Sequence, residues 1–140
     1  PFTKLGAPWL DAAALARRLF ELEMDEVDME LVEFTPDSGK YAGMMCKGLQ
    51  FSVHDRPHFQ PVFWGCLVVK LIKELHPVEF TWEPYPTLAN PSGTRHLNRL
   101  FGQTGSEEIF DLPMPLFLAK ITRLTRVASW YSEIQKYLLY

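Results

Sequence analysis

The chain has 140 residues, which is enough for one domain with a core that needs no metal or disulfide to hold it together. Hydrophobic residues make up 47% and charged residues 22%, as in ordinary globular proteins, so a disordered chain is excluded. The formal net charge of −3 disfavours a nucleic-acid partner, because binding to phosphates needs a basic surface.

The two cysteines, Cys46 and Cys66, fit no zinc motif, and no cofactor-binding or phosphate-binding motif is found. We expect Cys66, in an apolar run, to be a small buried hydrophobe. A Cys46–Cys66 disulfide stays open, because its geometry decides whether it forms. No segment is typical of a signal peptide or a membrane span. The chain opens at Pro1 without a methionine, and we interpret it as an excised domain.

The first half of the chain predicts a helix followed by strands. Leu10 to Leu22 has a helical apolar spacing, with Asp11 as a plausible N-cap. Val27 to Phe34 alternates apolar and acidic residues, which predicts a half-buried strand. Tyr41 to Val53 is expected to hold one or two strands, with Gly48 at a bulge or a close approach of two backbones.

A second helix is predicted from Gln60 to Leu75. Its side chains are apolar on nearly every side, which is typical of a buried helix that organises a core. Lys70, Lys73 and Glu74 are expected to form one solvated edge near its end.

The rest of the chain predicts short elements and one long helix. Val78 to Trp82 resembles a short strand, and Arg95 to Phe101 and Ser106 to Phe110 resemble short helices, the latter with its serine as N-cap. A last helix is predicted from Pro115 to about Gln135, with an apolar stripe through Phe117, Ile121, Leu124, Ala128 and Tyr131. We expect the apolar end, Tyr137 to Tyr140, to dock on the core, for example as a final strand.

Strand and helix segments alternate without a regular βαβ pattern, which favours an α+β fold. We therefore expect residues 1–140 to form a single domain in which a small mixed sheet packs around a buried central helix.

The densest polar cluster follows the predicted strands: His54, Asp55, Arg56 and His58. As a ligand-binding rim, Asp55 would accept hydrogen bonds from sugar hydroxyls and Arg56 would bind a carboxylate with its planar fork. As a structural turn, Asp55 would cap the next segment, Arg56 would pair with an acid and Pro57 would fix the backbone. A His54–His58 metal pair is disfavoured, because Pro57 interrupts the helix that such spacing needs.

Other candidates are weaker. No pair of carboxylates stands out as catalytic. Trp82 and Tyr85 are able to stack on a sugar ring, although ordinary core packing is the favoured explanation for each. Lys40 and Tyr41, just after a turn, form a second candidate rim, with a solvated lysine as the alternative.

Several short motifs, in this order along the chain, resemble the C-terminal domain of the peptidoglycan exo-β-N-acetylmuramidase (NamZ-type) family. They are GAPW (Gly6 to Trp9), KYAG (Lys40 to Gly43) with Cys46 and Gly48 after it, DR (Asp55-Arg56), F-P-V (Phe59, Pro61, Val62), FTW (Phe80 to Trp82) and YLLY (Tyr137 to Tyr140).

The resemblance implies a two-domain glycoside hydrolase that removes N-acetylmuramic acid from the ends of peptidoglycan fragments. Its catalytic residue would lie in an N-terminal domain outside this chain, and residues 1–140 would be an accessory, barrel-like domain that helps to close the cleft. The resemblance places Lys40, Tyr41, Asp55 and Arg56 among the substrate-binding residues. It further implies no cofactor and a periplasmic or secreted location, with the N-terminal domain and a peptidoglycan-derived sugar as partners.

Two alternatives stay open. The chain could be a non-catalytic interaction or dimerisation module without sugar contact. It could also be a self-contained small hydrolase that uses Asp55 with His54 or His58, although it lacks a recognisable nucleophile.

Overall fold

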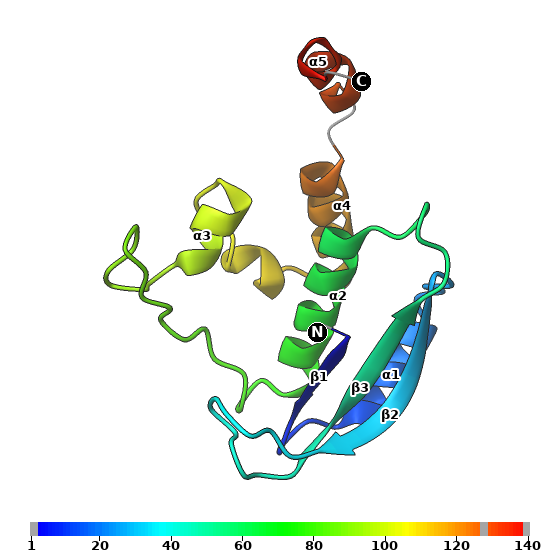
Figure 1. The fold of residues 1–140 in the computed structure, drawn as a ribbon, viewed down its shortest axis with the longest axis vertical. Coiled ribbons are helices and arrows are strands. Elements are labelled where there is room, and N and C mark those ends of the chain that lie inside the picture. The colour runs from blue at the N-terminus through cyan, green and yellow to red at the C-terminus, as the bar shows by residue number, and fades with distance from the viewer. Residues whose placement is uncertain (1–2, 127–128, 139–140) are drawn as a thin grey trace. The chain divides into compact units, whose positions relative to one another are not determined.

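The computed structural model describes residues 3–126 and 129–138 and divides into two compact units, Pro1–Glu83 and Pro84–Tyr140. The first unit contains all the strands of the described chain. Its elements are β1 (Lys4–Ala7), α1 (Ala12–Phe20), β2 (Val27–Phe34), β3 (Cys46–Val53) and α2 (Pro61–Leu75) (Figure 1). The second unit contains α3 (His96–Phe101), the 3₁₀ helix η1 (Glu108–Asp111), α4 (Met114–Thr125), α5 (Trp130–Ile134) and the 3₁₀ helix η2 (Gln135–Tyr137). The expectation of an α+β fold is confirmed.

The sheet has three strands in the order β1-β3-β2, with β3 in the centre. Both pairings are antiparallel, with Gly6 opposite Gly48 and Val27 opposite Val53. Within the described residues, the sheet is therefore antiparallel rather than mixed. It is also open rather than barrel-like, because β1 and β2 pair with β3 and not with each other.

The elements with strong local signals were predicted correctly. β2 has the predicted bounds, and β3 and α2 lie within the segments predicted for them. The Asp11 Oδ1 atom accepts a hydrogen bond from the Ala14 N–H at 2.9 Å, so Asp11 is the N-cap of α1. The prediction missed β1, whose four residues include Gly6 and are followed by Pro8. Such a strand carries little signal of its own and is held by its pairing with β3.

The core of the first unit is built from α1, β3 and α2. Leu15, Leu19, Leu49, Leu67 and Leu71 are almost completely buried. Burial of each such side chain stabilises the fold by about 1.5–3 kcal/mol. The rings of Phe51 in β3 and Trp64 in α2 meet edge to face, with centroids 4.4 Å apart. The description of α2 as a buried helix is confirmed.

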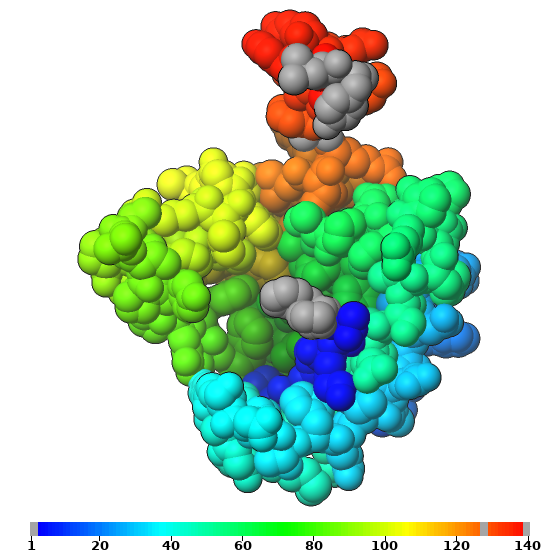
Figure 2. All heavy atoms as spheres, viewed as in Figure 1, coloured from blue at the N-terminus to red at the C-terminus, as the bar shows by residue number. Residues whose placement is uncertain are grey.

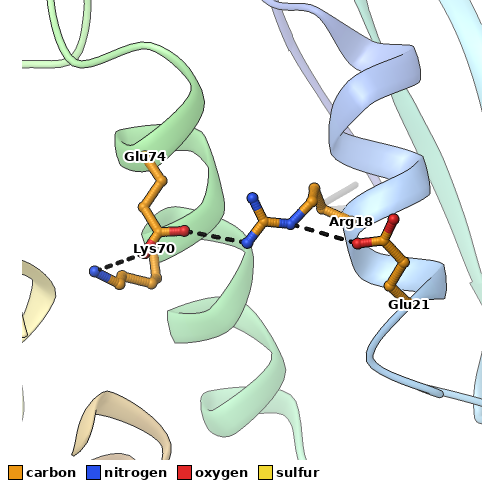
Figure 3. Close-up of polar contacts among 4 residues, drawn as sticks. All are labelled: Arg18, Glu21, Lys70 and Glu74. Carbon is orange, nitrogen blue, oxygen red and sulfur yellow. Dashed lines mark hydrogen bonds and ion pairs between the residues drawn. The ribbon is translucent and has the colours of Figure 1, made fainter. Parts of the chain in front are cut away.

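Lys70 of α2 is buried, with 4% of its surface exposed, so its predicted place on a solvated edge was wrong. Its Nζ lies 3.0 Å from Glu74 Oε1, and Glu74 Oε2 lies 3.4 Å from Arg18 Nη2 on α1. Arg18 Nε in turn lies 3.6 Å from Glu21 Oε2 (Figure 3). A lysine can be buried in this way because its stem packs among apolar groups while its ammonium stays paired.

The segment from Val78 to Trp82 is not the predicted strand, because Val78 and Glu79 belong to a turn and the three residues after them are irregular. The Phe80 N–H donates to the His76 carbonyl at 2.9 Å, directly after the end of α2. The alternating aromatic residues serve a local contact instead of a sheet, because the rings of Phe80 and Trp82 meet edge to face at 5.0 Å.

In the second unit, the predicted helices at α3 and η1 are present, but Ser106 is not a helix cap. It is fully buried, its Oγ donates to the Gln103 carbonyl, and its N–H donates to Asn98 Oδ1. Ser106 therefore fixes the loop before η1.

The long helix predicted from Pro115 to Gln135 is instead two helices, α4 and α5. Phe117 and Ile121 of the predicted stripe are buried, Ala128 lies outside the described residues, and Tyr131 is exposed. Tyr137, in η2, is 74% exposed, so the described part of the chain end forms neither a strand nor a docked terminus. Residues 139–140 lie outside the described part. Among the described residues, no helix is long and apolar enough to cross a membrane.

Candidate functional site

The four predicted site residues fall into two groups at opposite ends of β3 (Figure 1). Lys40 and Tyr41 precede the start of this strand, whereas Asp55 and Arg56 follow its end. A strand of eight residues spans about 25 Å. The structure therefore does not bring the four residues together, and each group has to be assessed separately.

The first group belongs to a cluster that we call the Trp9 corner: Trp9, Lys40, Tyr41, His76 and Glu83. The Trp9 indole N–H donates to the Tyr41 hydroxyl at 2.8 Å, and the Trp9 ring lies 5.2 Å from that of His76. His76 Nε2 accepts from the backbone N–H at the N-cap of α1, at 3.1 Å. These contacts join three loops that are far apart in the sequence.

The Lys40 ammonium forms an ion pair with the Glu83 carboxylate and donates a hydrogen bond to it. This hydrogen bond raises the pKa of Lys40. Its ammonium also lies 5.7 Å from the centre of the Tyr41 ring. A depression of about 290 Å³ beside the corner is lined partly by Trp9, Tyr41 and Phe80. In Figure 2, the β2–β3 loop that carries Lys40 and Tyr41 (cyan) forms the surface beside β1 (blue). The polar atoms of this corner are largely engaged with one another.

Three of the motifs quoted above meet at this depression. Its lining includes residues from the GAPW, KYAG and FTW motifs. The sequence did not indicate this convergence, because the three segments are separated by more than 30 residues each and only the fold brings them together.

We predict that Tyr41→Phe lowers the free energy of unfolding by about 1 kcal/mol, because the Trp9 N–H loses its acceptor while the ring is kept. Urea unfolding of the chain measures this change. Tyr131→Phe, at an exposed tyrosine, is the matched control and should change stability by less than about 0.5 kcal/mol. Equal effects of the two substitutions would show that the Trp9–Tyr41 bond does not stabilise the corner.

The second group lies beside a larger depression, which we call the Arg56 groove: Arg56, Phe51, Ser52, Phe59 and Trp64. Its volume is about 740 Å³. Three aromatic residues contribute to its lining: Phe59 is half-buried, whereas Phe51 and Trp64 are largely buried behind it. The Trp64 ring lies 4.4 Å from that of Phe51 and 6.2 Å from that of Phe59 between ring centres. Arg56 is exposed and makes no hydrogen bond or ion pair with any residue that the structure describes. The groove thus combines an apolar surface with an available cation.

Asp55 and Arg56 differ in their contacts. The Asp55 carboxylate lies 2.8 Å from His58 Nδ1, and the Asp55 carbonyl accepts from the Phe59 N–H at 3.1 Å. Asp55 therefore fixes the turn, although it does not cap the next helix as the structural alternative expected, because the N-cap of α2 is Gln60. That alternative is wrong for Arg56, which pairs with no acid in the described chain.

The two histidines of the cluster bind different carboxylates. His54 Nδ1 lies 3.1 Å from Asp28 Oδ2, whereas His58 contacts Asp55. Asp55 therefore pairs with His58 and not with His54. Within residues 3–126 and 129–138, no three His, Cys, Asp or Glu side chains are grouped so that they could hold a metal ion.

The remaining candidates have structural contacts. Lys73 Nζ lies 5.8 Å from the centre of the Trp82 ring, and the Tyr85 ring lies 5.0 Å from that of His96 in the second unit. Cys46 and Cys66 are both buried free thiols, so they form no disulfide. Burial raises the pKa of the Cys66 thiol to about 11, which keeps it unreactive at neutral pH.

Comparison with known proteins identifies the family. The model of the family described as "Exo-beta-N-acetylmuramidase NamZ, C-terminal" matches residues 1–140. The chain belongs to this NamZ C-terminal family. The resemblance found in the sequence is therefore confirmed.

Two relatives match this chain, one in sequence and one in fold. The chain is 36% identical over 80 residues to the peptidoglycan β-N-acetylmuramidase NamZ of Bacillus subtilis (strain 168), and this match covers 57% of the chain and 19% of that protein. It also shares its fold with the crystal structure of a DUF1343 family protein from Bacteroides fragilis NCTC 9343, with a TM-score of 0.60 and 20% identity. That match covers 100% of this chain and 35% of the solved one. The matches of this NamZ C-terminal domain thus cover about a fifth and about a third of the lengths of these relatives.

Proposed function

We propose that this chain is the accessory domain of a two-domain exo-acting muramidase and that its Arg56 groove contributes one wall of the substrate cleft. The catalytic group would then lie in the N-terminal part of the parent protein. The relative from Bacillus subtilis carries the name of a peptidoglycan β-N-acetylmuramidase, and this supports a peptidoglycan-derived sugar as the ligand.

The observation that carries the proposal is the exposed Arg56, which has no partner among the described residues, beside a groove lined partly by Phe59. N-acetylmuramic acid combines a pyranose ring, whose faces are apolar, with a lactyl carboxylate. The ring is suited to the half-buried Phe59, behind which the largely buried Phe51 and Trp64 lie, and the carboxylate is suited to the guanidinium fork. A volume of about 740 Å³ lies within the range of small-molecule sites.

The other predicted residues have smaller parts in this proposal. Asp55 holds the turn that presents Arg56, so it acts as a positioning residue. Lys40 and Tyr41 are engaged in the Trp9 corner and lie at the other end of β3. We propose that they shape the cleft rim from there instead of contacting the same sugar as Arg56.

The test is a calorimetric titration of the chain with N-acetylmuramic acid and, in parallel, with N-acetylglucosamine, which lacks the lactyl carboxylate. We expect N-acetylmuramic acid to bind at least about tenfold more tightly, because one charge-assisted interaction contributes roughly 1.5–3 kcal/mol. Equal binding of both sugars would contradict a role for Arg56 in recognition. Failure to bind either sugar would favour the alternative of a docking module.

A further inference from the structure

The C-terminal helical segment, α5 with η2, exposes an unusual amount of aromatic surface. Trp130 is 58% exposed, Tyr131 69%, Tyr137 74% and Leu138 43%. No residue of α5 or η2 is buried. On a soluble protein, a contiguous patch of exposed apolar side chains often marks an interaction site.

The spacing of these residues produces one apolar stripe. Trp130, Ile134 and Tyr137 recur at intervals of four and three residues, as on one face of a helix, and Leu138 follows directly after η2. The remaining positions are Tyr131, Ser132, Glu133, Gln135 and Lys136, and all of these except the exposed Tyr131 are polar, so the segment is amphipathic. This pattern predicts that the stripe is covered by another apolar surface in the working protein.

The length of the segment supports the same inference. α5 has five residues and η2 has three, whereas an isolated helix shorter than about 12–15 residues is only marginally stable in water. The packing of α5 is with η2. A segment of this size needs contacts with a larger surface to hold its conformation.

Two occupants of the stripe can be compared by area. A stable dimer interface buries about 800 Å² on each partner, which is more than eight residues supply. A partner within the same polypeptide needs less area, because the covalent link provides a high effective concentration. The matches cover 19% and 35% of the two relatives, so a parent of similar length has a large body of polypeptide outside the chain.

We propose that Trp130, Ile134, Tyr137 and Leu138 form the surface by which this domain docks on the remaining polypeptide of its parent protein. The inference shares one assumption with the proposed function, namely that the chain is part of a longer parent protein. It assigns a surface to the contact between the two parts, and it does not depend on which sugar the Arg56 groove binds.

Hydrogen–deuterium exchange of residues 130–138 tests the inference, measured in the full-length parent and in the 140-residue chain under the same conditions. We expect these amides to exchange at least about tenfold more slowly in the parent, because docking stabilises the segment. In the parent carrying Trp130→Glu and Tyr137→Glu together, the fast exchange should return. Leu88→Glu, at a fully exposed leucine of the second unit, is the matched control and should leave the protection unchanged.

Three results would overturn the inference. Equal exchange in the parent and the chain would show that the stripe stays uncovered. If the 140-residue chain alone exchanges slowly and the rate depends on its concentration, a second copy of the chain covers the stripe. If the slow exchange does not depend on concentration, the chain's own core covers it. Arg56→Ala should retain the protection in the parent, so failure of the docking surface can be distinguished from failure of the sugar site.

Discussion

Substitution of Gly48 by alanine is expected to unfold the sheet of the first unit or to destabilise it by at least about 3 kcal/mol. Gly48 lies in β3, the central strand, directly opposite Gly6 of β1. A Cβ atom at position 48 would lie 2.0 Å from the Leu5 carbonyl oxygen and 2.9 Å from the Gly6 Cα. Both atoms belong to the backbone, so no side chain can rotate away and the two strands have to separate.

The matched control is Gly65→Ala in α2. A Cβ atom at that position meets nothing within 4 Å, and alanine favours a helix over glycine by roughly 0.8–1 kcal/mol. Gly65→Ala should therefore leave stability unchanged or raise it. Urea unfolding followed by circular dichroism measures both variants. A Gly48→Ala protein as stable as the wild type would show that β1 does not approach β3 as closely as the structure places it.

The parts of the fold that could be predicted are those whose signal is local. The alternation in β2 and the nearly continuous apolar surface of α2 each contain their own evidence, and so does the capping by Asp11. By contrast, β1 depends on pairing with β3, and the burial of Lys70 depends on its surroundings in the fold. Nothing in the sequence near these two positions distinguishes them from a loop and a solvated lysine.

The same division applies to the candidate site. Arg56 was predicted as a candidate because its residue type and its place after a strand are visible in the sequence, and its role stays a prediction. The separation of Arg56 from Lys40 was not predictable, because the stretch from Tyr41 to Val53 left open one strand or two. A single eight-residue strand places the two groups at opposite ends, whereas a hairpin would have returned them to the same end. The bond between Trp9 and Tyr41 joins residues 32 positions apart, and no local pattern encodes it.

In the full-length parent, we expect Arg56→Ala to lower kcat/KM for a substrate with a terminal N-acetylmuramic acid by roughly 10- to 150-fold. The range corresponds to the loss of one charge-assisted interaction, about 1.5–3 kcal/mol. Because Arg56 has no partner among the described residues, its removal should leave stability nearly unchanged, so the loss reports on the substrate. Arg56→Lys keeps the charge but not the planar fork and should recover only part of the activity.

Two controls make this prediction specific. Arg17→Ala removes an exposed arginine on α1 that does not line the groove, and should leave kcat/KM unchanged. A substrate with terminal N-acetylglucosamine offers no lactyl carboxylate, so whatever turnover it supports should not respond to Arg56→Ala. If Arg56→Ala slows both substrates equally, the arginine acts on the sugar ring or on the fold of the cleft and does not recognise the carboxylate. If it slows neither, the Arg56 groove lies outside the substrate cleft.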